Sequence, residues 1–189
     1  MLLKSDAHLV ATDWSRDGRL ILYQRGPLSN RDLYVLPVTE KSEPLPVQTT
    51  PFDEIHGQFS PNGRWVAFVT NESGRYQVYV RSFPGNDRKI QISTEGGMQP
   101  RWRRDGGELY FLGGDTALMA VPMRSVETLD PGVPVRLFET AIPGDPVFAG
   151  ISRYAVTPEP TRFLFLLQDT QTAVNPIIVV QNWLAAVTR

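Results

Sequence analysis

The stretch "GQFSPNGRWVAFVT", residues Gly57–Thr70, places a polar turn between an aromatic residue and a run of apolar residues. The turn residues Pro61, Asn62 and Gly63 favour a tight hairpin, because Asn and Gly tolerate the positive backbone angles that such a turn needs. The run after the turn is rich in β-branched and aromatic residues, which is typical of a buried strand. The stretch therefore predicts two consecutive antiparallel strands.

The same pattern occurs three more times, as "TDWSRDGRLILYQR", "PRWRRDGGELYFLG" and "YAVTPEPTRFLFLL". The residues that precede the four turns are about 45, 43 and 54 positions apart, close to the roughly 40 to 45 residues of a four-stranded propeller blade. We expect each of these residues to anchor its blade by packing against a neighbouring blade. The predicted anchors are Trp14, Phe59, Trp102 and Val156.

A third and a fourth strand complete most of the copies. The third strands are "DLYVLPV", "QVYVRSF", "ALMAVPM" and "NPIIVVQ", and weaker fourth strands lie around residues 47–49, 90–93 and 135–138. Helical patterning is nearly absent, with residues 183–187 as the only candidate turn. The sequence predicts an all-β chain: one β-propeller domain over residues 1–189, with about four four-stranded blades near residues 7–50, 51–94, 95–140 and 146–189.

The two ends of this repeat complement each other. No fourth strand follows Val180, whereas residues 2–4 form a short apolar segment ahead of the first copy. If residues 2–4 complete the last blade within one chain, the ring has four blades. If they complete it between two chains, through strand exchange in a homodimer, the ring has eight blades. The third alternative is that the chain is part of a larger propeller.

The copies resemble TolB-like (WD40-like) propeller repeats, whose hallmark is an aromatic-Ser-Pro-Asp-Gly turn before an apolar strand. Residues Phe59–Gly85 match this hallmark best, with Asn62 in place of Asp. The segments "NESGRYQVYVRSFPG", "GGMQPRWRRDGGELYFL", "LMAVPM" and "NPIIVVQNWLAAV" resemble the C-terminal, sensor-like propellers of some bacterial serine/threonine kinases. The resemblance implies a non-catalytic module for protein or ligand recognition. The sequence leaves its localisation open, with the extracytoplasmic part of a membrane-anchored parent protein as one alternative.

Catalytic signatures are missing from the sequence itself. It contains no Gly-rich nucleotide loop, no His-Arg-Asp or Asp-Phe-Gly motif and no Gly-x-Ser-x-Gly elbow, so we expect no kinase or hydrolase activity from this chain. Two alternatives to a sensor module are an accessory propeller that gates a prolyl oligopeptidase-type peptidase and a purely structural assembly unit. A kinase domain encoded before this chain favours the sensor module, and a hydrolase domain encoded after it favours the peptidase propeller.

The composition of the chain limits the classes of partner and site that we expect. The 189 residues carry a formal net charge of -1, and a dedicated nucleic-acid-binding protein is usually more basic. In "RWRRDGGELYFL", a strand places Trp102 on one face and its arginine neighbours on the other, so we expect a blade scaffold and no nucleic-acid contact. No segment is long and apolar enough to span a membrane. The absence of Cys excludes disulfides and thiolate metal sites.

The one cluster of potential metal ligands is Asp53, Glu54 and His56. Because adjacent residues of a strand point to opposite faces, we interpret this cluster as a surface loop, and we expect no metal and no cofactor. Any ligand or partner site is predicted at the mouth of the central channel, which the innermost strands line. The candidates lie one or three positions before the anchors: Asp13, His56, Gln58, Gln99, Arg101 and Arg153.

Overall fold

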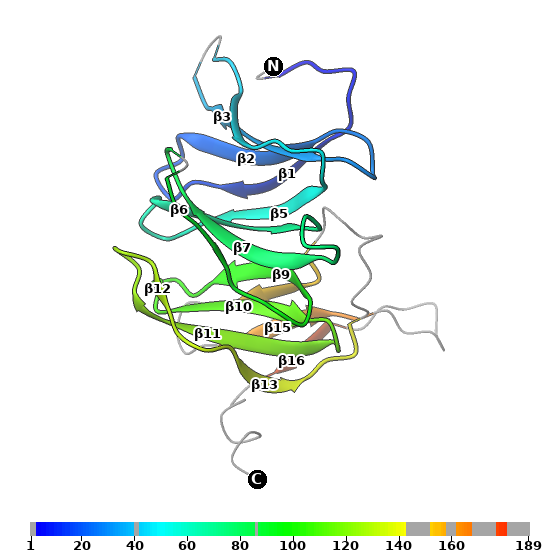
Figure 1. Cartoon of the computed structure of the whole chain (residues 1–189), viewed down its shortest axis with the longest axis vertical. Coiled ribbons are helices and arrows are strands. Elements are labelled where there is room, and N and C mark those ends of the chain that lie inside the picture. The colour runs from blue at the N-terminus through cyan, green and yellow to red at the C-terminus, as the bar shows by residue number, and fades with distance from the viewer. Residues whose placement is uncertain are drawn as a thin grey trace.

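The computed structural model describes residues 3–39, 42–85, 87–142, 152–157 and 162–167, and the backbone of residues 177–180. Within these ranges the chain forms strands and turns and contains no helix. Four antiparallel sheets follow one another in chain order (Figure 1). The all-β propeller architecture predicted from the repeated hairpins is confirmed; residues 183–187 lie outside the described ranges.

Each of the first two sheets has four strands in chain order. The first sheet contains β1 (Leu9–Trp14), β2 (Leu20–Arg25), β3 (Asp32–Pro37) and β4 (Leu45–Gln48). The second contains β5 (Glu54–Phe59), β6 (Trp65–Thr70), β7 (Gln77–Ser82) and β8 (Lys89–Gln91). In both sheets the weak fourth strand of the sequence pattern is present.

The third and fourth sheets depart from this regular pattern. The third contains β9 (Gly97–Trp102), β10 (Glu108–Gly113), β11 (Ala117–Ser125), β12 (Asp130–Pro131) and β13 (Val135–Glu139), and both β12 and β13 pair with β11. The fourth contains β14 (Tyr154–Val156), β15 (Phe163–Leu166) and β16 (Ile177–Val180). The short strand β12 was not predicted from the sequence.

A side-chain hydroxyl accepts a backbone hydrogen bond in the turn between the first two strands of three sheets. In the second sheet the Ser60 hydroxyl donates to Asn62 Oδ1 (2.7 Å) and accepts from the Trp65 backbone N–H (3.0 Å). Gly63 sits at the end of the turn with a φ of 69°. Ser15 makes the equivalent bonds in the first sheet, and Thr157 accepts the equivalent backbone bond in the fourth. The first two sheets thus combine a hydroxyl, an Asx side chain and a glycine in this turn, whereas the third sheet has Arg103 at the hydroxyl position.

The core consists of two apolar clusters that meet at the second sheet. Val66 and Phe68 of β6 join the cluster shared with the first sheet, whereas Ala67 and Val69 join the cluster shared with the third sheet. Successive strand residues point to opposite faces, so a strand between two sheets must be apolar throughout. This alternation defines two faces of every sheet: a preceding face, toward the earlier sheet, and a following face, toward the later one.

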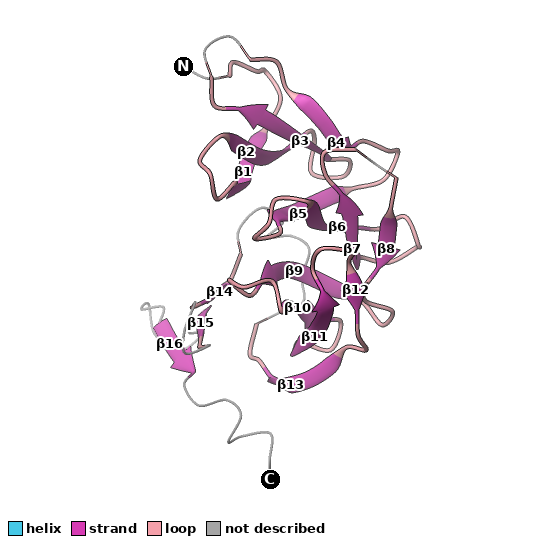
Figure 2. Ribbon diagram, turned by 90° about the vertical axis from the view of Figure 1, so that its left-hand side faces the viewer, coloured by secondary structure: helices cyan, strands magenta, loops and turns pink. Residues whose placement is uncertain are grey.

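The sheets pack through their first strands. β5 contacts β1 and β2 of the sheet before it, and β9 contacts both β5 and β14. Figure 2 shows the same succession, with the second sheet between the first and the third and the fourth beside the third. No strand of the first sheet pairs with a strand of the fourth among the described residues.

Ring closure stays a prediction. Leu3 and Lys4 are not part of a strand, in contrast to the short strand expected at residues 2–4, and residues 1 and 2 lie outside the described ranges. A segment this short has no stability of its own as a strand and needs a pairing partner.

Three of the four predicted anchors pack between sheets. Phe59 and Trp102 are 6% and 7% exposed and belong to the clusters between sheets, and half-buried Val156 packs against the second of these clusters. Trp14, in contrast, is 57% exposed. The reason is geometric: an anchor packs against the preceding sheet, and no sheet precedes the first one in the described structure.

Candidate functional site

Several of the predicted channel residues lie at junctions between sheets, on first strands whose backbone is irregular. Register shifts interrupt the pairing of β1, β5 and β9 with their second strands. His56 and Gln99 take left-handed backbone angles, with φ values of 55° and 53°. Because bulges redirect side chains out of the regular alternation, these positions do not follow the strand pattern that the sequence implies.

The positions one before the anchors link neighbouring sheets. Asp13 Oδ2 accepts a hydrogen bond from the Phe59 backbone N–H (2.8 Å), and Gln58 Oε1 accepts one from the Trp102 backbone N–H (2.7 Å). Burial raises the pKa of the Asp13 carboxyl, and the bonded backbone N–H of Phe59 opposes that rise. Asp13 and Gln58 therefore have the same structural role in successive copies.

The positions three before the anchors are buried at the same junctions. Gln99 Oε1 accepts from the Arg153 backbone N–H (2.7 Å), while the Tyr154 hydroxyl donates to the Gln99 carbonyl oxygen (2.9 Å). The His56 backbone N–H donates to Gln24 Oε1 (3.3 Å). The structure thus connects His56 to the first sheet, and Gln99 and Arg153 to each other.

Arg101 is the remaining candidate. Burial lowers the pKa of its guanidinium, and the electrostatic effects of Tyr154 and Asp13 oppose that shift. Its side chain therefore lies in a partly desolvated environment on the inner strand β9. The use of Asp13, His56, Gln58, Gln99, Arg101 and Arg153 as a ligand-binding mouth stays a prediction; the contacts of Asp13, Gln58 and Gln99 assign these three a role in joining sheets.

A small pocket of about 180 Å³ lies where the first three hairpin turns meet. Asp13 and Gln58 line it, together with Arg16, Arg103 and Arg104. Arg103 is held by Asp105 (2.7 Å) and Glu108 (2.8 Å). A volume of 180 Å³ is small compared with the 300 to 1,000 Å³ typical of small-molecule sites.

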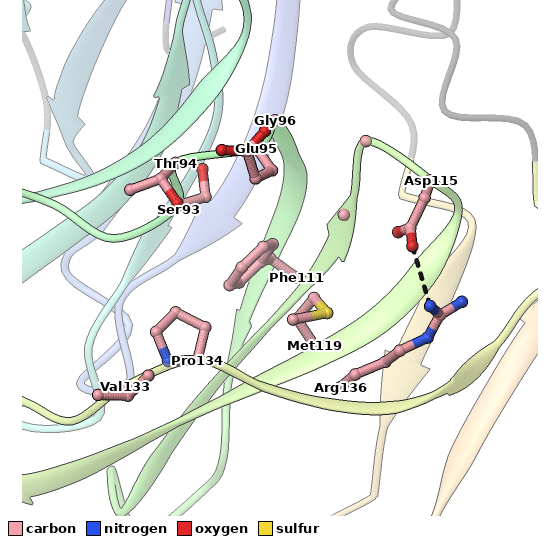
Figure 3. Close-up of a pocket in the computed structure, with 12 residues that line it drawn as sticks. Ser93, Thr94, Glu95, Gly96, Phe111, Asp115, Met119, Val133, Pro134 and Arg136 are labelled. Atoms are coloured by element: carbon pink, nitrogen blue, oxygen red, sulfur yellow. Dashed lines mark ion pairs between the residues drawn. The ribbon is translucent and has the colours of Figure 1, made fainter.

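A larger cavity of about 620 Å³ lies on the third sheet, where sequence reasoning had placed no site. Figure 3 shows Phe111 of β10 and Met119 of β11 beside Pro134, which precedes β13, in the apolar part of its lining. At its edge Arg136 is paired with Asp115 (3.1 Å). The cavity thus combines an apolar floor with a charged rim, as small-molecule sites do.

Glycines let two loops approach closely at this cavity. Gly96 follows β8 with a φ of 93°, and a Cβ added to Gly114 would lie 2.5 Å from the Glu95 carbonyl oxygen. The signal in the sequence was the pair of Gly-Gly dipeptides, at residues 96–97 and 113–114. A Gly-Gly dipeptide by itself indicates only a turn, and the proximity of these two depends on the pairing of β9 with β10.

The predicted surface loop at Asp53, Glu54 and His56 is wrong, because all three residues are buried. Asp53 forms a buried ion pair with Arg31 of the first sheet (Nη2 to Oδ2, 2.5 Å) and accepts a hydrogen bond from the Tyr76 hydroxyl (2.9 Å). An ion pair compensates for the burial that a carboxylate would not otherwise tolerate. Among the residues that the structure describes, no group of three His, Cys, Asp or Glu side chains is arranged to hold a metal ion.

Burial raises the pKa of Glu54 to about 7. Its carboxyl accepts hydrogen bonds from the Thr50 hydroxyl and the Thr50 backbone N–H, and these bonds limit the rise. Glu54 therefore titrates near neutral pH in the folded chain.

In the described ranges no helix has the length and apolar character needed to cross a bilayer.

Sequence comparisons identify no relative: no family model matches the chain, and no curated protein matches it. Structural comparison finds TolB from Acinetobacter baumannii, with a TM-score of 0.68 and 13% identity over 90% of this chain and 40% of that one. A puromycin-hydrolysing peptidase of Mycobacterium tuberculosis gives a TM-score of 0.69 and 16% identity over 93% of this chain and 30% of that one.

A further similar structure is the β-propeller domain of the Trilobed protease from Pyrococcus furiosus, which has an open velcro topology. Its TM-score is 0.54 and its identity 13%, over 93% of this chain and 55% of that one. The chain thus spans less than half of TolB and of the mycobacterial peptidase. The TM-scores of 0.54 to 0.69 show a common fold, and at identities of 13% to 16% the similarity extends to the fold alone.

Proposed function

Since the chain has a TolB-like β-propeller fold, we propose that it is a non-catalytic recognition module whose ligand binds in the 620 Å³ cavity of the third sheet. The cavity carries this proposal because its volume lies within the range of small-molecule sites. Propellers generally present binding sites at the ends of their blades, where loops converge on a rigid scaffold. Here the loops after β8, β10 and β12 converge in this way.

The lining indicates the chemistry of the ligand. Phe111 and Met119 offer a flat apolar surface and a polarisable thioether, which favour an aromatic or branched aliphatic group. Asp115 and Arg136 at the rim suit a polar substituent, because either charged group gains a charge-assisted hydrogen bond from it. The proposed ligand is therefore a small molecule with an apolar group and a polar end.

The parent protein is proposed to be a bacterial serine/threonine kinase in which this propeller is the C-terminal, extracytoplasmic sensor. The sequence resemblance over "NESGRYQVYVRSFPG" and the final segment supports this context. The test is the complete gene: a kinase domain encoded before this chain agrees with the proposal. A nucleophile elbow encoded after it contradicts the proposal.

The alternative is a gating propeller of a prolyl oligopeptidase-type peptidase. The structural similarity to the mycobacterial peptidase favours it as the second candidate. A hydrolase domain in the same polypeptide is its discriminating feature. A purely structural assembly unit is the third candidate, and it predicts that the 620 Å³ cavity binds no small molecule.

Fragment binding followed by protein NMR tests the recognition function. We expect aromatic fragments with one polar group to shift the amide signals of Gly96 and Gly113, which border the cavity. Val133→Glu should weaken this binding at least tenfold, because Val133 lines the cavity and is exposed, so its substitution spares the core. Val135→Glu is the matched control, because Val135 is also exposed but does not line the cavity. The affinity of this variant for the fragments should stay within twofold of that of the unaltered protein.

Two outcomes contradict the proposal. One is that no fragment shifts these signals at millimolar concentration. The other is that fragments shift the signals of Gln58 and Arg101 instead, which would place recognition at the channel mouth.

A further inference from the structure

The fourth sheet presents an apolar face that is covered in the second sheet. In the turn of the second sheet, the Ser60 backbone N–H donates to the Trp65 carbonyl oxygen, and in the fourth sheet Thr157 donates to Arg162 in the same way. Superposing these two turns aligns Leu164 with Ala67 and Leu166 with Val69. Ala67 and Val69 are fully buried on the following face of the second sheet. Their counterparts Leu164 and Leu166 are 38% and 48% exposed, so the following face of the fourth sheet is open.

The first sheet is open on the opposite side. In the first sheet, the equivalent turn bond runs from the Ser15 backbone N–H to the Leu20 carbonyl oxygen, and it aligns Ile21 with Val66 and Trp14 with Phe59. Val66 and Phe59 lie on the preceding face of the second sheet. Trp14 is exposed and Ile21 is half-buried, whereas Val66 and Phe59 are buried. Both of these faces carry apolar side chains, as the covered faces of the second sheet do.

The two open faces fit each other as a projection and a hollow. A hollow of about 190 Å³ lies over β14 and β15 and is lined by Ala155, Leu164 and Leu166, among others. Ala155 occupies the position of Gln58, which accepts a hydrogen bond from the Trp102 backbone N–H in the next sheet. The short Ala155 side chain leaves room for an aromatic ring at this place, and Trp14 is the exposed aromatic anchor.

We propose that a second copy of this chain inserts its Trp14 into the hollow over β14 and β15. The contact continues the interface that the chain already builds between successive sheets, with an anchor of one sheet packed against the following face of another. Two such contacts, related by a two-fold axis, join two chains into a ring of eight blades. This inference does not depend on the cavity ligand.

Sedimentation equilibrium over a concentration series tests the contact. The unaltered chain should have the mass of two chains. Trp14→Glu and Leu166→Asp should each weaken the association at least tenfold, because each places a charge in an apolar contact. Leu28→Glu is the matched control, because Leu28 is exposed but lies in the loop after β2, away from both faces. The association constant of this variant should stay within twofold of that of the unaltered chain.

Circular dichroism of the two variants separates lost association from lost folding. Both substituted side chains are exposed in a single chain, so both spectra should match that of the unaltered protein. A monomer at every concentration overturns the proposal. A dimer that both variants leave unchanged overturns it as well.

Discussion

The strands β6 and β15 have similar sequences and opposite environments. β6 reads "WVAFVT" and is buried at all six positions, whereas β15 reads "FLFL" and alternates between buried and exposed residues. Both strands are apolar on both faces. The difference is the neighbour: β6 lies between two sheets, and β15 packs on the third sheet through Phe163 and Phe165. Exposure at equivalent positions therefore reports which sheet faces lack a partner.

Equivalent charges on these two strands should have the most different effects. Val69→Asp should reduce the free energy of unfolding by about 4 kcal/mol or more, because it buries an unpaired carboxylate between two sheets. Leu166→Asp at the equivalent position should change the stability of the single chain by less than about 0.5 kcal/mol. Urea unfolding below the concentration at which chains associate measures both. Equal losses would show that the two strands share one environment.

The junction between the first two sheets should depend on a buried ion pair. Asp53→Asn should cost about 3 to 5 kcal/mol, because it removes the carboxylate that pairs with the buried Arg31 guanidinium. Asp130→Asn removes the exposed partner of Arg124 and should cost at most about 1 kcal/mol. Thermal unfolding measures both variants. A small effect of Asp53→Asn would mean that water reaches this junction.

Loss of the turn serine should destabilise the fold more in the second sheet than in the first. Ser60→Ala should cost about 1 to 2 kcal/mol, because Ser60 is buried and its loss leaves the Trp65 backbone N–H without its acceptor. Ser15→Ala removes the same bond in the half-buried turn of the first sheet, where water replaces it, and should cost less than Ser60→Ala. Chemical unfolding compares the two directly. A larger loss at Ser15 would contradict the assignment of the first sheet as open.

Glu54 should give the stability of the fold a pH dependence. Its pKa is about 7 in the folded chain and near 4.5 in the unfolded chain. A raised carboxyl pKa stabilises the fold fully below pH 4.5, and this contribution is lost as pH rises to about 7. Glu54→Gln should remove this part of the pH dependence between pH 4.5 and 7. Thermal unfolding across this range measures it, and an unchanged slope in Glu54→Gln would contradict the assignment.

The sequence predicted the fold because its signals are local. Asn62 and Gly63 mark a turn through their own backbone preferences, and an apolar run next to them marks a strand. The repeat then places the anchors Phe59 and Trp102 between sheets, where the structure has them. These inferences need no knowledge of distant contacts.

The sites were harder to predict because they depend on distant contacts. Asp53 appeared to be a loop residue until Arg31, from another sheet, was placed against it. Trp14 appeared to be equivalent to Phe59 because a repeat pattern does not record which copies have neighbours. The cavity beside Phe111 arises from loops that only the paired strands bring together.

Cross-linking tests most directly whether the two open faces meet. The chain has no cysteine, so Ile21→Cys in one preparation and Leu164→Cys in another introduce single thiols on opposite faces while keeping Trp14. After mixing and treatment with a short thiol cross-linker, we expect a covalent product that contains one chain of each kind. The control pair is Leu28→Cys with Leu164→Cys, which should give only background. Cross-linking of the Ile21→Cys mixture at the level of this control would contradict the account.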